Sequence, residues 1–112
     1  MLLVECLPEF SRELTELLIA AGKPALAAQV DRLEIVAKCS CNDDFCASFY
    51  TARRPFERYG ESRQSLEVQP AQGMILLDVM GDTIIFIEVL YRDDVRARLI
   101  PLSLESPRYF GK

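Results

Sequence analysis

Apolar residues follow two different spacings along the chain, first one typical of helices and then one typical of strands. Between residues 8 and 21, apolar side chains recur every three or four positions, charged side chains fill the opposite face, and Gly22 predicts the end of the helix. Residues 24–33 repeat this spacing and again start with a proline, which suits the first turn of a helix. The first third of the chain therefore predicts two consecutive helices.

From residue 34 onwards the pattern predicts strands. Several runs are rich in β-branched and aromatic residues, and turn residues separate most of them. These runs span residues 34–41, 46–51, 66–69, 74–80 and 83–91. Helices followed by strands are typical of an α+β domain, so we expect two N-terminal helices packed on an antiparallel β-sheet of about five strands. The length suits a single domain, 1–112.

The last two predicted strands meet at Gly81 and Asp82, which suit a two-residue hairpin turn. A regular hairpin around this turn pairs Leu77 with Phe86, and side chains then alternate between two faces. One face carries Ile75, Leu77, Val79, Ile84 and Phe86, and the other carries Met74, Leu76, Met80, Ile85, Ile87 and Val89. Both faces of the hairpin are therefore expected to be apolar.

An apolar sheet face of this size needs a cover. The two helices can cover one face. The other could be covered by residues 99–110, by the long loop 52–65, by a second copy of the chain or by a different protein. The same register places Asp78 and Glu88 on opposite faces, so we do not expect these carboxylates to act as a pair.

The hairpin also carries a resemblance. From Gly73 to Leu90 the chain fits the pattern G-x-x-x-L-D-x-x-G-x-x-I-x-x-I-E-V-L. This segment of about 18 residues resembles the strand-turn-strand of small uncharacterised bacterial proteins. The resemblance implies a bacterial origin and a small α+β fold, but it implies no catalytic or binding residues.

Charge and composition exclude several classes of function. The net charge of -4 opposes general binding to nucleic acids or anionic membranes, since both depend on lysine and arginine. No apolar run approaches the roughly 18 residues of a membrane span, and the N-terminus lacks the features of a signal peptide, so we expect a cytoplasmic protein. The chain has no histidine, which removes the commonest general base, and we expect no enzymatic activity.

Three of the four cysteines, Cys39, Cys41 and Cys46, fall close together in the sequence. If residues 42–45 form a turn, Cys41 and Cys46 lie across from each other and Cys39 lies on the same face, so three sulfurs converge. Together with Cys6 they could hold zinc as four thiolates. The spacing is not the usual Cys-x-x-Cys of structural zinc, so core packing and redox chemistry remain alternatives.

The long loop interleaves arginines with aromatic residues, a composition that can contact an acidic protein surface or stack on a nucleotide. The residues that we expect to bind a partner are Arg53, Arg54, Phe56, Arg58 and Tyr59 in this loop and Met74, Leu76, Ile85 and Ile87 in the hairpin.

An acidic chain whose hairpin is apolar on both faces favours a non-catalytic protein-binding module, such as an inhibitor or immunity-type protein for a basic partner. Self-association would bury the same apolar surface. One alternative is a metal-binding regulatory module that uses the cysteines. Another is a small ligand- or nucleotide-binding domain that uses the loop from Arg53 to Arg63.

Overall fold

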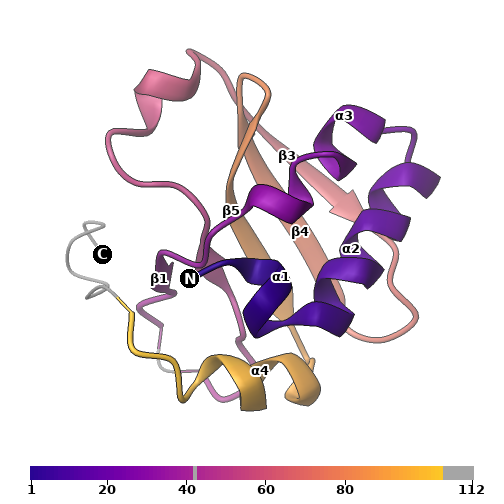
Figure 1. Cartoon of the computed structure of the whole chain (residues 1–112), viewed down its shortest axis with the longest axis vertical. Helices are drawn as coiled ribbons and strands as arrows, with labels where there is room; N and C mark the ends of the chain where they lie inside the picture. Colours follow the sequence, from indigo (N-terminus) through magenta and orange to yellow (C-terminus); the bar gives the residue numbers. More distant parts are fainter. Residues whose placement is uncertain (42, 105–112) are drawn as a thin grey trace.

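Helices α1, α2 and α3 lie together against one face of a five-stranded antiparallel sheet (Figure 1) in the computed structural model, which describes residues 1–41 and 43–104. The helices are α1 (Leu3–Cys6), α2 (Pro8–Ala20), α3 (Pro24–Ala27) and α4 (Asp93–Leu99), with 3-10 turns η1 (Val30–Arg32) and η2 (Phe56–Tyr59). The strands, in spatial order, are β1 (Ala37–Lys38), β2 (Phe49–Tyr50), β5 (Thr83–Leu90), β4 (Met74–Met80) and β3 (Arg63–Val68). The predicted α+β class is confirmed.

Helix α2 begins where the sequence predicts and buries its apolar stripe. Phe10, Leu14 and Leu18 belong to the main core, and the ring of Phe10 packs edge-on against Phe49 of β2 with centroids 6.2 Å apart. Gly22 then adopts a φ of 74°, the left-handed conformation that ends many helices. In the part of the chain that the structure describes, every helix is too short or too polar to cross a membrane.

The second predicted helix is interrupted, because α3 ends at Ala27 and η1 begins at Val30. Gln29 lies between them and turns its side chain toward the β4–β5 hairpin. Its carbonyl oxygen accepts a hydrogen bond from the N–H of Ile84 at 3.2 Å, and its Nε2 donates to the carbonyl of Asp82. The break therefore lies where the helical layer is tied to the turn of the hairpin.

The strands predicted for residues 34–41 and 46–51 are shorter than expected, because β1 and β2 each keep two residues in regular pairing. The segment before β1 pairs with the N-terminus instead, as the N–H of Leu3 donates to the carbonyl of Leu33 at 2.9 Å. Strand β3 starts at Arg63, ahead of the predicted run.

The β4–β5 hairpin has the predicted turn but not the predicted register. Val79 pairs with Ile84, as in a regular hairpin. The next pair joins Asp78 to Phe86, so Ile85 has no partner in β4 and forms a β-bulge. Beyond the bulge, each side chain of β5 lies on the face opposite to the one predicted.

The bulge corrects two predictions. Leu77 pairs with Ile87 rather than with Phe86, so Ile87 is fully buried in the main core while Phe86 packs on the other face. Asp78 pairs with Phe86, and Glu88 pairs with Leu76, two positions along the ladder. Side chains two positions apart point to the same face, so Asp78 and Glu88 share that other face. The predicted separation of these two carboxylates is wrong.

Buried hydrogen bonds hold the bulge from its β2 side. Thr51 is 8% exposed, its N–H donates to the carbonyl of Ile85 at 2.9 Å, and its hydroxyl donates to the carbonyl of Ile84 at 2.8 Å. Both carbonyls at the bulge therefore have hydrogen-bond partners away from water.

We call the sheet face that points away from α1, α2 and α3 the open face. The long loop covers one end of it, since Phe56 and Tyr59 pack against the buried side chains of Met80 and Ile85. The C-terminal segment up to residue 104 packs against the main core instead, and the predicted cover by residues 105–110 lies outside the described residues.

Arg92, which precedes α4, joins that helix to α2 through a cluster of ion pairs. Its guanidinium is 8% exposed and donates to Glu13 of α2 at 2.7 and 2.8 Å and to Asp94 of α4 at 2.9 and 3.0 Å. These hydrogen bonds hold the pKa of the Asp94 carboxyl below its usual value and raise the pKa of Arg92. The cluster therefore keeps its charges in the folded protein.

Replacing Thr51 with valine keeps the shape of the side chain but leaves the buried carbonyl of Ile84 without its hydroxyl donor. We expect Thr51→Val to lower the free energy of unfolding by about 1–3 kcal/mol, measured by urea denaturation. Thr83→Val, at the start of β5, is the control and should change it by less than about 0.5 kcal/mol. Equal losses in both variants would mean that the hydroxyl does not hold the bulge.

Arg92→Met removes the donor that Glu13 and Asp94 share, and we expect a loss of about 1.5–3 kcal/mol at neutral pH. Because the pKa of Asp94 is lower in the folded protein, its contribution is complete above the usual pKa of about 4 and is lost as pH falls through the folded value. The difference between wild type and variant, followed by denaturation at several pH values, should therefore shrink in acid. Arg98→Met, whose pairing with Glu9 is exposed, should cost less than about 1 kcal/mol throughout.

Candidate metal centre

Three cysteine thiols meet at one end of the open face. The Sγ atoms of Cys39, Cys41 and Cys46 all lie within 4.8 Å of one another. The β1–β2 register, continued past its two paired residues, sets Cys41 opposite Cys46. It also sets Cys39 opposite Ser48, and the Cys39 N–H donates to the Ser48 carbonyl at 2.9 Å. The predicted convergence of these three sulfurs is confirmed.

The segment that carries Cys46 is anchored to the end of β5. Cys46 forms a β-bridge with Leu90, and the N–H of Tyr91 donates to the carbonyl of Phe45 at 2.9 Å. The rings of Phe45 and Tyr91 stack with centroids 5.2 Å apart. These contacts fix Cys46 relative to the sheet.

The three thiols lie at the surface rather than in the core. Cys39 and Cys46 are half-buried and Cys41 is exposed, so the alternative in which they pack between the sheet and the helices is wrong. Burial raises the pKa of the Cys46 thiol, which donates a hydrogen bond to the Ser48 hydroxyl oxygen at 3.2 Å. Burial therefore favours the neutral thiol of Cys46.

The fourth predicted ligand lies elsewhere. Cys6 belongs to α1, where it packs partly buried against the main core, and it is not in the thiol group. The predicted set of four cysteines is thus corrected to three. Three thiolates suit thiophilic ions such as Zn²⁺ or Cu⁺, and with Zn²⁺ they leave one coordination position open.

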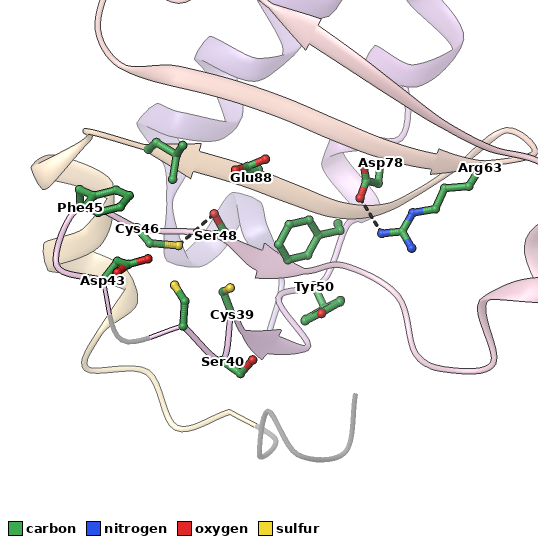
Figure 2. Close-up of a pocket in the computed structure, with 13 residues that line it drawn as sticks. Cys39, Ser40, Asp43, Phe45, Cys46, Ser48, Tyr50, Arg63, Asp78 and Glu88 are labelled. Carbon is green, nitrogen blue, oxygen red and sulfur yellow. Dashed lines mark hydrogen bonds and ion pairs between the residues drawn. The ribbon is translucent and has the colours of Figure 1, made fainter. Parts of the chain in front are cut away.

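Two cavities adjoin the thiols, and all three cysteines line both of them. The larger, about 480 Å³, is a cleft along the open face (Figure 2). The smaller, about 210 Å³, lies toward α4 and is also lined by Lys38 and Arg96. Asp43 is exposed and lines both cavities, so its carboxylate is a possible oxygen ligand.

The cleft runs from the thiols to a polar cluster on β3 and β4. Asp78 accepts hydrogen bonds from Arg63 at 2.6 Å and from the Ser65 hydroxyl at 2.8 Å. Between this cluster and the thiols lies the half-buried carboxylate of Glu88 (Figure 2), and Phe86 also lines the cleft. Within residues 1–41 and 43–104, the Glu88 side chain has no hydrogen bond or ion pair.

The structure places the predicted partner-binding residues of the loop away from this cleft. Arg58 donates to the carbonyls of Arg54 and Pro55, and Arg53 pairs with Glu34 at 3.5 Å. None of the loop residues predicted to bind a partner lines the cleft, whereas Arg63, at the start of β3, does.

The predicted hairpin residues divide between surface and core. Met74 is 39% exposed and Leu76 is half-buried. Ile85 and Ile87 are fully buried within the chain, so neither side chain is available to a partner. The bulge is the cause for Ile87, and the loop that carries η2 is the cause for Ile85.

Sequence reasoning missed two charged residues beside the thiols. Glu88 reaches the open face only because of the bulge, and Arg96 comes from α4, far along the chain. The Nε of Arg96 is buried and has no hydrogen-bond partner among the described residues. No local pattern in the sequence marks Arg96, whereas the sign for Glu88 is that a regular register would bury its charge.

Comparisons of the chain with family models, curated proteins and solved structures return no significant match. The chemistry of the site itself therefore carries the functional inference.

Proposed function

We propose that this protein is a metal-binding module that holds one thiophilic ion, most readily Zn²⁺, through Cys39, Cys41 and Cys46. The observation that carries the proposal is the spacing of the three sulfurs, which lie within 4.8 Å of one another. Sulfurs that share a tetrahedral zinc ion at about 2.3 Å are about 3.8 Å apart, so side-chain adjustments of about 1 Å would suffice. A reducing cytoplasm would keep the three thiols available for the ion.

The charges around the thiols also support the proposal. Zn²⁺ with three thiolates carries a net charge of about -1. Lys38 and Arg96 line the cavity on one side of the thiols and would offset this charge. The Nε of Arg96 has no hydrogen-bond partner within residues 1–41 and 43–104, so it is the kind of donor that a metal-bound thiolate would satisfy. Such outer hydrogen bonds orient metal ligands.

The metal site is better supported than the two other roles considered. A protein-binding role relied partly on Ile85 and Ile87, which the chain itself buries. A nucleotide-binding role relied on the loop arginines, and Arg58 is already bonded to the backbone of its own loop. Neither role has a convergence of functional groups comparable to the three thiols.

The direct test is a native mass spectrum of the freshly purified chain, with and without a chelator. We expect one metal ion per chain, removed by the chelator. Cys39→Ser, Cys41→Ser and Cys46→Ser should each weaken zinc binding at least tenfold in competition with a chromophoric chelator. Cys6→Ser, which changes the remaining cysteine, should leave the affinity unchanged. A metal-free wild type that takes up no added zinc would contradict the proposal.

Arg96 gives a second, independent test, because it would act through the thiolates rather than bind the metal. Arg96→Leu should weaken zinc binding by about 10–100-fold. Arg96→Lys, which keeps the charge but loses the Nε donor, should fall between this variant and the wild type. The control is Arg98→Leu on the same helix, because Arg98 pairs with the exposed Glu9. Equal affinities for all four proteins would remove Arg96 from the site.

A further inference from the structure

The three thiols and the Glu88 carboxylate line the same cleft. We propose, on the basis of the metal centre above, that this cleft binds a small aminothiol. The thiolate of the ligand takes the open position on the metal, releasing its proton to solvent and displacing water, while its ammonium group pairs with Glu88. The cavity of about 480 Å³ has the size of known small-molecule sites.

The strand register puts Glu88 within reach of such a ligand. Cys46 forms a bridge with Leu90, in the same register as the β2–β5 pairs. This register sets Ser48 opposite Glu88, two positions further along. Glu88 is thus the diagonal neighbour of Cys46, at a Cα separation of about 7–8 Å. A metal–sulfur bond of about 2.3 Å and a two-carbon linker can bridge the remaining gap.

Three described carboxylates line the cleft, and Glu88 is the half-buried one without a hydrogen bond or ion pair, whereas Asp43 is exposed to water. Asp78, the neighbour of Glu88 on the open face, is already bonded to Arg63 and Ser65. A half-buried carboxylate without a partner favours a bound cation, because its charge is incompletely solvated. The aromatic rings of Tyr50 and Phe86, with centroids 4.6 Å apart, line the same cleft and can attract a cation through their faces.

Charge balance favours one ligand that carries both groups. Lys38 and Arg96 offset the charge of the three-thiolate zinc centre, but Glu88 still contributes about one negative charge to the cleft. A simple thiolate would add a further negative charge beside Glu88, and a simple amine would leave the thiophilic position to a weaker donor. An aminothiol is neutral overall when its thiol is ionised, so it satisfies both groups without adding charge.

The test uses the full chain loaded with Co²⁺, whose visible spectrum responds to a change of ligand. Cysteamine and 2-mercaptoethanol are titrated in parallel, because they differ only in an amino or a hydroxyl group. We expect cysteamine to reach its half-maximal spectral change at about tenfold lower concentration. Glu88→Gln should narrow this difference, because it removes the partner of the ammonium group and also relieves the repulsion between Glu88 and the thiolate of 2-mercaptoethanol. The control Glu67→Gln, in the same row of the open face but on the edge strand β3, should preserve the difference.

Each contrary result has a distinct meaning. Equal half-maximal concentrations in the wild type would overturn recognition of the ammonium, even if the Glu88→Gln variant did not fold. No spectral change with either thiol would mean that a protein oxygen, such as that of Asp43, closes the position, and the aminothiol proposal would fail alone. If the chain took up no Co²⁺, or showed no thiolate-to-cobalt charge-transfer band, the metal centre itself would be refuted and the aminothiol site with it.

Discussion

The extra residue at the β-bulge, Ile85, determines what each face of the sheet presents. A regular hairpin would have paired Leu77 with Phe86 and turned Glu88 toward α1, α2 and α3, among buried leucines and isoleucines. Burying an unpaired carboxylate there would cost several kcal/mol. With the bulge, β5 delivers Ile87 to the core and Glu88 to the open face. The core and the candidate site therefore depend on the same local irregularity.

The parts of the fold that follow from short-range patterns were predictable. The helical spacing of α2, the turn at Gly81 and the bounds of β4 each depend on residues close in sequence. The bulge could not be read in the same way, because residues 84–87 are apolar throughout and either register buries apolar side chains. The sequence does contain one sign of the bulge, because a regular register would have buried the charge of Glu88.

The candidate site was predictable to the same extent. Convergence of Cys39, Cys41 and Cys46 follows from a single turn between two neighbouring strands. The assignment of Cys6 required the N-terminal segment to reach the open face, whereas α1 packs with the helices on the other side of the sheet. Arg96 approaches the thiols from a helix far along the chain, and contacts of such long range leave no periodic trace in a sequence.

Strands β1 and β2 each contribute two paired residues, and between them they carry the segment that holds all three thiols. So short a ladder has few hydrogen bonds to break, which places this corner at the low end of the range of local opening free energies. An ion shared by the three thiolates would cross-link the end of β1 to the segment that leads into β2. Metal binding would then stabilise the folded form of this sheet edge, and local unfolding would release the ion. Amide hydrogen exchange at this edge would be slower in the metal-bound protein than in the metal-free one.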